Sequence, residues 1–135
     1  MTTRKPNIIL LVLDTHRADR MSIYRYPKST TPNLDALGEQ STVFEWGIAP
    51  APWTIPSHAS MFTGTYSTVH QATEYFHVLP DSIPTLAELL ANAGYETVGF
   101  CNNPLISLLE TGLRRGFNQF YNYSAIFRDR PQVSS

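Results

Sequence analysis

The sequence lacks the features that mark several large classes of protein. Cys101 is the only cysteine among 135 residues, so no disulfide can form within the chain and nothing indicates an oxidising compartment. Ten Lys and Arg residues stand against eleven Asp and Glu residues, and this balance excludes the basic surplus that recruits nucleic acid or a membrane surface. The longest apolar run, 8–13, is far shorter than the roughly 20 residues that span a bilayer. We therefore expect a cytoplasmic protein with neither nucleic acid nor membrane as a partner.

Hydrophobic residues make up 42% of the chain and charged residues 16%, which is typical of a globular protein. No glycine-rich phosphate loop follows the apolar run 8–13, and this absence argues against a nucleotide-binding doubly wound domain. Any site for phosphate or sulfate must therefore be local, since the net charge of −1 gives no attractive field over the whole surface.

The first half of the chain predicts two strands and a helix. The run 8–13 is continuously apolar, as expected of a central parallel strand that is buried on both faces. Asp14 follows at the carboxyl end of this strand, where open α/β sheets bind their ligands. Thr31 and Pro32 predict the N-cap and first turn of a helix whose buried face includes Leu34 and Leu37. Residues 41–46 are rich in β-formers and predict a short strand.

The second half predicts a helix and strand in succession. Residues 84–91 form an amphipathic helical pattern that begins near Ser82 or Ile83. Gly94 is placed to cap this helix in the left-handed conformation, and 95–101 follows as a strand. Together with the first half, this succession predicts an α/β fold with a mainly parallel sheet flanked by helices.

One segment, 53–64, carries a chemical pattern. Pro56 suits the first turn of a helix over 57–62 that stops near Thr63-Gly64. It also disfavours the α region for Ile55, which would then be the N-cap. Thr54 would lie just ahead of the helix, facing the N–H groups of Ser57, His58 and Ala59. Such N–H groups attract phosphate or sulfate oxygens. A hydroxyl beside an anion-binding helix start is a candidate nucleophile.

This segment resembles the nucleophile motif of sulfatases, in which Cys or Ser, any residue, Pro, Ser and Arg are followed by four residues and Thr-Gly. Here Thr54, Pro56, Ser57 and His58 are followed, after four residues that include Ala59, by Thr63-Gly64. Four further stretches are similar to family segments, in the same order, and these are 13–19, 31–37, 79–103 and 115–120. The chain is thus identified as a member of the sulfatase family of the alkaline-phosphatase superfamily, with a partial fold of that type.

The resemblance implies a metal-dependent ester hydrolase. Thr54 takes the position of the Cys or Ser that sulfatases convert to formylglycine, and threonine cannot give that aldehyde, so no formylglycine is expected. Threonine here is similar to the phosphodiesterase branch, where a metal-bound Thr attacks phosphorus. By resemblance, Thr54 and His58 are catalytic, Ser57 and His58 bind substrate, and Asp14 and Thr54 bind a divalent metal. Zinc, calcium, magnesium and manganese all remain open, as do sulfate and phosphate esters of small molecules or conjugates.

Some of the candidate residues, and other charged or polar residues near the motifs, also have structural interpretations that involve no ligand. His58 could contact a substrate anion or pack beside Trp53, and Ser57 could brace the loop. Arg17 is expected to pair with Asp19 or Asp35 rather than with a ligand. His70 resembles a family histidine, with a solvent-facing loop histidine as the equal alternative.

The resemblance also implies that residues 1–135 are the incomplete N-terminal portion of a sulfatase-like hydrolase domain. Family members complete the metal site with ligands that come after the segments matched here, so these 135 residues alone are expected to be inactive. The alternative is a truncated or degenerate module that binds anions or a partner without catalysis. Uncovered sheet edges would favour self-association.

Overall fold

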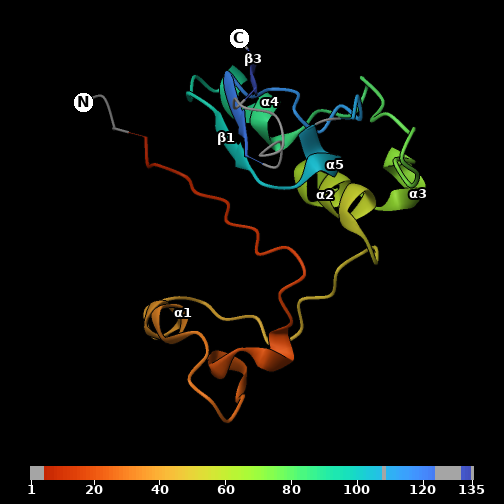
Figure 1. Cartoon of the computed structure of the whole chain (residues 1–135). Coiled ribbons are helices and arrows are strands. Elements are labelled where there is room, and N and C mark those ends of the chain that lie inside the picture. Colours follow the sequence, from red (N-terminus) through yellow and green to blue (C-terminus); the bar gives the residue numbers. More distant parts are fainter. Residues whose placement is uncertain (1–4, 108, 124–131, 135) are drawn as a thin grey trace. The chain divides into compact units, whose positions relative to one another are not determined.

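The computed structural model describes residues 5–107, 109–123 and 132–134. The chain divides into two compact units, Met1–Gly47 and Ile48–Ser135. The elements of the first unit are η1 (Ala18–Arg20), η2 (Ser22–Tyr24) and α1 (Pro32–Gly38). Those of the second are α2 (Thr54–Thr63), α3 (Ser67–His70), α4 (Leu86–Asn92), β1 (Val98–Cys101), α5 (Pro104–Ser107), β2 (Gln119–Asn122) and β3 (Gln132–Ser134) (Figure 1).

In the first unit, polar side chains hold η2 against α1. Thr31 is the N-cap of α1 and Pro32 its first residue, which confirms the predicted start of this helix. The Thr31 hydroxyl accepts a hydrogen bond from the Ser22 backbone N–H (3.1 Å) and donates one to Asp35 (3.1 Å). The predicted buried face is only partly correct, because Leu34 is half-buried but Leu37 is 61% exposed.

The two strands predicted in this unit are wrong. Among the described residues, neither 8–13 nor 41–46 belongs to the sheet, and the side chains of 8–13 are 37–89% exposed. Phe44 and Trp46 are 73% and 87% exposed. A strand exists only as part of a hydrogen-bonded ladder, so an apolar run without a paired neighbour remains extended chain.

The second unit contains a three-stranded sheet in the order β1-β2-β3. β1 and β2 are parallel, with Gly99 opposite Phe120, and β2 and β3 are antiparallel. Gly99 is required at its position, because a Cβ there would lie 2.5 Å from the Phe120 ring. β1 confirms the predicted strand 95–101 in a shorter form and stands at one edge of the described sheet.

A local capping signal fixes the start of α4. Thr85 is the N-cap, its hydroxyl accepts from the Glu88 N–H, and the Glu88 carboxylate accepts from the Thr85 N–H. The helix therefore begins three residues beyond Ile83, the later of the two predicted starts. Gly94 has φ 80° and donates its N–H to Ala91, as predicted for the residue that ends this helix.

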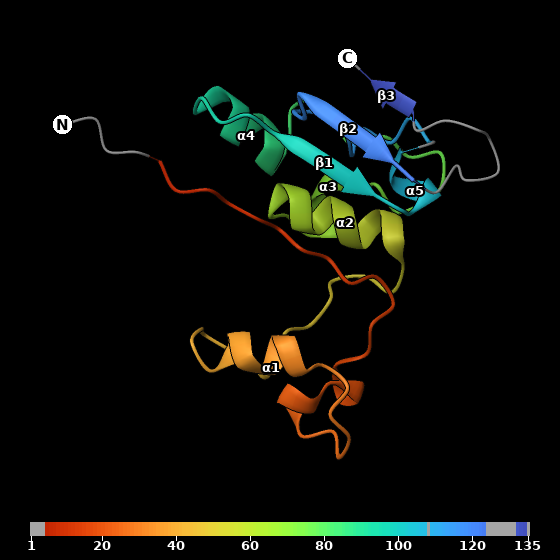
Figure 2. The ribbon, with the colours of Figure 1, turned by 60° about the vertical axis from the view of Figure 1, so that its left-hand side comes forward.

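The core of the second unit lies between α2 and the sheet. Figure 2 shows α2 along one side of β1 and β2. Ile55 and Ala59 of α2 are fully buried, and they belong to one apolar cluster with Phe120 of β2, Leu79 and Leu113. Burial of this one face therefore holds α2, which begins at Thr54, against the sheet.

Two polar residues extend the parallel ladder by one step beyond β1 and β2. The Thr97 N–H donates to the Asn118 side-chain oxygen (2.9 Å), and the Asn118 N–H donates to the Thr97 carbonyl (2.9 Å). Both residues directly precede the first paired residues of their strands, Val98 and Gln119. This reciprocal pair therefore fixes the register in which β1 and β2 align.

Candidate active site around Thr54

The helix that carries the candidate nucleophile begins earlier than predicted. Trp53, in an extended conformation, is the N-cap, and Thr54 is the first helical residue. The Ser57 N–H donates to the Trp53 carbonyl (3.2 Å), which is the first bond of α2. Ile55 is therefore not the N-cap, and Thr54 is not ahead of the helix. The predicted end is confirmed, because Gly64 has φ 67° and caps the helix by donating to Ser60.

This shift changes which N–H groups an anion would meet. A helix leaves the N–H groups of its first turn without partners within the helix. In α2 these belong to Trp53, Thr54 and Ile55, and the third helical residue, Pro56, has no N–H to leave unpaired. The prediction that the N–H groups of Ser57, His58 and Ala59 are free to bind an anion is wrong, because these residues lie within the hydrogen-bonded part of the helix.

The Thr54 hydroxyl has a partner from a distant part of the chain. The side-chain amide of Asn103 donates to Thr54 Oγ1 at 3.3 Å. Asn103 stands between the end of β1 and the start of α5, at Pro104. Sequence reasoning missed this residue, although the carboxyl end of a parallel strand is where ligands bind in α/β sheets. The two asparagines after 95–101, of which Asn103 is the second, were the available signal.

His58 is buried against its own helix. Its side chain is 5% exposed, and Nδ1 lies 2.8 Å from the Thr54 backbone oxygen. A carbonyl oxygen only accepts, so Nδ1 carries a hydrogen and donates to it. The ring also meets Phe62 edge-on, with 5.9 Å between the centroids. Ser57, the preceding residue, is half-buried. The catalytic and substrate-binding roles of His58 and Ser57 stay predictions.

His70 is a structural residue of this unit, and the solvent-facing alternative is wrong. It is fully buried, its Nδ1 accepts from the Ala72 N–H (3.1 Å), and its Nε2 lies 2.9 Å from the Ser60 hydroxyl of α2. Nδ1 therefore has no hydrogen, and Nε2–H donates to Ser60. Burial lowers the pKa of His70, while an opposing hydrogen bond with the Pro56 backbone favours the charged form. The neutral ring thus braces α3 against α2.

Asp14 belongs to the first compact unit, whereas Thr54, Ser57 and His58 belong to the second. It lies on an exposed turn in which the His16 N–H donates to the Leu13 carbonyl (3.2 Å) and Thr15 has φ 59°. Beyond the turn, Arg17 makes two hydrogen bonds to the Asp19 carboxylate, at 2.8 and 2.7 Å. The expectation that Arg17 has an ion-pairing role is confirmed, with Asp19 as its partner.

Metal ligation by Asp14 and Thr54 stays a prediction. Within the part of the chain that the structure describes, no three His, Cys, Asp or Glu side chains gather closely enough to hold a metal ion. Asp14 supplies a carboxylate and Thr54 a hydroxyl, and oxygen donors of this kind fit magnesium, calcium or manganese as well as zinc.

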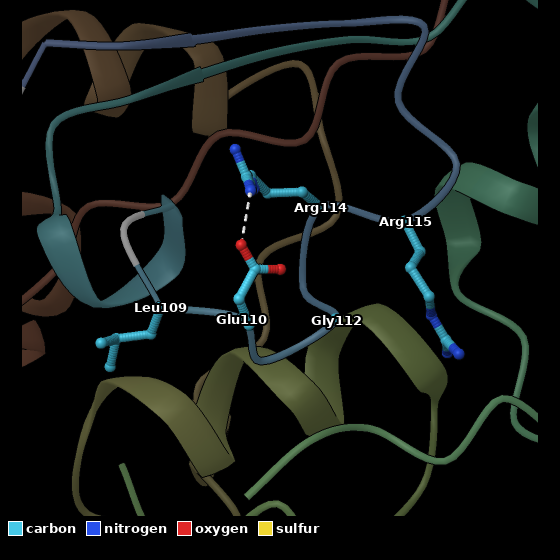
Figure 3. A pocket seen from close by; sticks show the side chains of 5 residues that line it. All are labelled: Leu109, Glu110, Gly112, Arg114 and Arg115. Carbon is cyan, nitrogen blue, oxygen red and sulfur yellow. Dashed lines mark ion pairs between the residues drawn. The ribbon is translucent and has the colours of Figure 1, made fainter. Parts of the chain in front are cut away.

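A hollow elsewhere in the second unit is lined by Leu109, Glu110, Gly112, Arg114 and Arg115. Figure 3 shows Arg114 directed toward Glu110, with their charged groups 3.9 Å apart, and Arg115 directed away from both. Arg115 instead binds Asp81 (2.9 Å) and the Ile83 carbonyl (2.7 Å). Because this arginine is already engaged and no candidate residue lines the hollow, the site of interest remains the start of α2.

Comparisons with known proteins agree with the motif. The family model described as Sulfatase matches residues 6–134. An N-acetylglucosamine-6-O-sulfatase from Bacteroides thetaiotaomicron is 32% identical over 95 residues, which cover 70% of this chain and 17% of that protein. The human N-acetylgalactosamine-6-sulfatase is 32% identical over 103 residues, covering 67% and 20%. A putative transferase, YhbX, from Escherichia coli K12 is 34% identical over 89 residues, covering 66% and 15%.

A solved structure has the same fold over most of the chain. BT4656, in complex with its substrate D-glucosamine-2-N,6-O-disulfate, superposes with a TM-score of 0.74 and 29% identity. The match covers 87% of this chain and 23% of BT4656. The chain therefore belongs to the sulfatase family and has an α/β fold of that type. It spans about a fifth of the length of the relatives it matches. Among the described residues, no helix is both long enough and apolar enough to cross a membrane.

Proposed function

We propose that this chain is the nucleophile-bearing part of a metal-dependent hydrolase that acts on a sulfate or phosphate ester, with Thr54 as the nucleophile. The observation that carries the proposal is the environment of Thr54. Its hydroxyl is on the first residue of α2, beside the N–H groups of the helix start, and it accepts a hydrogen bond from Asn103. Backbone N–H groups at a helix start favour the oxygens of a bound oxyanion.

The proposed reaction has two displacements. Thr54 Oγ1 loses its proton and forms a bond to phosphorus or sulfur, and the ester alcohol leaves with the bonding electrons and takes up a proton. Water then attacks the same phosphorus or sulfur atom, which restores the Thr54 hydroxyl and releases sulfate, phosphate or, from a diester, a phosphate monoester. A divalent ion, held by Asp14 and Thr54, would stabilise the alkoxide and withdraw charge from the ester oxygens. Ser57 and His58, which follow Thr54 on the same helix, are proposed to contact the ester.

Relatives support an ester of a small molecule or glycan as the substrate. Two of them are named as sulfatases of N-acetylated amino sugars, and BT4656 has a doubly sulfated glucosamine as its substrate. The Thr54 side chain cannot become formylglycine, which favours a phosphate ester in this chain. The YhbX relative is named a putative transferase. In a transferase, an acceptor other than water would take the group from the covalent threonine intermediate.

The test is turnover, by a complete enzyme that contains this chain, of phosphodiester, phosphomonoester and sulfate-ester substrates with added zinc, manganese, magnesium or calcium. Thr54→Ala is expected to abolish turnover, and Thr54→Ser to keep part of it because the hydroxyl survives. Thr68→Ala, which removes an exposed threonine hydroxyl from α3, is the matched control and should match the wild type. Equal rates for Thr54→Ala and the wild type would rule out this nucleophile.

The second candidate function is a non-catalytic module that binds an anion or a partner. It is favoured by the absence, among the described residues, of three clustered metal-binding side chains. A complete protein containing this chain that turns over none of the esters with any of the four metals would support it. Self-association through the β1 edge is a separate prediction, measurable by sedimentation.

A further inference from the structure

The contact between Asn103 and Thr54 joins residues that are 49 positions apart in the sequence. It is the bond that reaches the candidate nucleophile from outside its own helix. We propose that Asn103 is the positioning residue of the Thr54 hydroxyl: its amide sets the side-chain rotamer of Thr54 and holds Oγ1 ready for attack. The rotamer part stands on geometry alone, and the catalytic part rests on the proposed function of Thr54.

The hydrogen bond made by the side-chain oxygen of Asn103 fixes the orientation of its amide group. Its side-chain oxygen accepts from the Leu105 N–H at 2.9 Å, so the NH₂ group is the end that faces Thr54. The Asn103 backbone is held as well, because its N–H donates to Cys101 Sγ at 3.2 Å. Pro104 follows and restricts Asn103 to extended conformations. The donor therefore has little freedom to turn away from Thr54.

The usual helical partner of a threonine hydroxyl is missing at Thr54. A threonine in a helix divides between two χ1 rotamers, because its hydroxyl can bond to a carbonyl three or four residues earlier. Thr54 is the first helical residue, so the chain before it supplies no helical carbonyl of this kind. A donor at 3.3 Å favours the one rotamer that places Oγ1 beside Asn103.

The same bond has a chemical consequence. A hydroxyl oxygen has two lone pairs and one hydrogen. The Asn103 N–H occupies one lone pair. Once the hydroxyl has lost its hydrogen to a base or solvent, the oxygen has two further lone pairs, one for the proposed metal ion and one for attack. Donation to Oγ1 also strengthens as the oxygen becomes negative, so it favours the alkoxide over the neutral hydroxyl.

A purely structural role for Asn103 makes a different prediction. Its oxygen caps α5, and serine is also a good cap at such a position. Asn103→Ser keeps a capping oxygen but has no amide to reach Thr54, whereas Asn103→Ala loses both. If Asn103 only caps α5, serine restores the wild-type behaviour. If it positions Thr54, serine restores stability alone.

The first experiment measures the Thr54 χ1 rotamer by three-bond NMR couplings to Cγ2, and it needs no enzymatic activity. The wild type should show a single rotamer, and Asn103→Ser should show averaged couplings with unchanged backbone shifts away from Thr54. Asn102→Ser, at the exposed neighbour, is the control and should keep the single rotamer. A single, unchanged rotamer in Asn103→Ser would overturn the proposal.

The second experiment measures ester turnover in the same variants. Removal of a donor to the reacting oxygen should lower kcat about 100-fold in both Asn103→Ser and Asn103→Ala, with KM within about twofold of the wild type. A kcat within about twofold of the wild type in Asn103→Ser would refute the catalytic part. If the complete wild-type enzyme shows no turnover, the proposed function fails, and the rotamer measurement still decides whether Asn103 positions Thr54.

Discussion

The two compact units use apolar side chains in different ways. In the second unit, Ile55, Leu79 and Leu113 are at most 1% exposed and form one cluster beneath the sheet. In the first unit, the run 8–13 has six consecutive apolar residues, yet Leu11 is 69% exposed and Ile9 is 89% exposed. The less apolar stretch, Val98–Cys101, is the one that forms a strand. Apolar composition thus supplies the tendency to be buried, and only a paired neighbour turns it into a strand.

The largest expected effect comes from replacing one leucine by alanine in each unit and comparing the free energies of unfolding. Leu113→Ala should lower the free energy of unfolding by about 2–5 kcal/mol, because it leaves a cavity in a closed core. Leu11→Ala should change it by less than about 0.5 kcal/mol, because that side chain is already exposed. Urea denaturation followed by circular dichroism measures both. A large loss from Leu11→Ala would show that 8–13 is buried in solution.

The same contrast explains how much of the fold was predictable. The starts and ends of helices depend on local signals, so Thr31, Pro32, Gly64 and Gly94 were placed correctly from the sequence. The exact start of α2 was not, since Pro56 is tolerated at any position of a first turn that lacks hydrogen bonds. Strands depend on partners far along the chain, and no local pattern in 8–13 reports whether such a partner is paired with it.

The residues of the candidate site also differ in whether a local sequence signal or a distant partner reveals them. Thr54, Ser57 and His58 are close together in the sequence and on one helix, so a motif could find them. Asn103 meets Thr54 only because β1 ends beside α2, and this depends on packing rather than spacing. The buried position of His70 was likewise unpredictable, because its partners Ser60 and Ala72 are ordinary residues that carry no signal.

A smaller effect distinguishes a buried histidine from an exposed one. Burial lowers the pKa of His70, so the unfolded chain takes up a proton first as the pH falls below the ordinary histidine value of about 6.5. The free energy of unfolding should therefore decrease as the pH falls from about 6.5 to the lower native pKa of His70. Above pH about 6.5 the contribution of the neutral ring to stability should be complete.

His70→Gln should remove this pH dependence while keeping a donor near Ser60. His16→Gln, at an exposed position of the first unit, is the control and should leave it intact. Denaturation midpoints in urea at pH 7.5, 6.5 and 5.5 measure the effect. An unchanged slope in His70→Gln would mean that other groups cause the acid sensitivity.

The smallest expected effect concerns the ion pair of the first unit. Arg17 lowers the pKa of Asp19 mainly by its side-chain hydrogen bonds, and both side chains are exposed. Exposed ion pairs contribute little to stability. Arg17→Gln should therefore leave the denaturation midpoint unchanged while the pKa of Asp19 rises in an NMR titration, whereas Lys28→Gln should change neither. A shifted midpoint in Arg17→Gln alone would show that this turn helps to hold its unit together.

The polar pair that extends the parallel ladder has a consequence for chemistry at the other end of the strand. The pair of Thr97 and Asn118 fixes one end of β1, and Asn103 lies six residues after Thr97, beyond the last β1 residue, Cys101. Each strand residue advances by about 3.3 Å, so a shift of one residue would carry the Asn103 amide about one hydrogen-bond length away from Thr54. The distance between the Asn103 amide and the hydroxyl of Thr54, the proposed nucleophile, therefore depends on a hydrogen-bonded pair at the opposite end of β1.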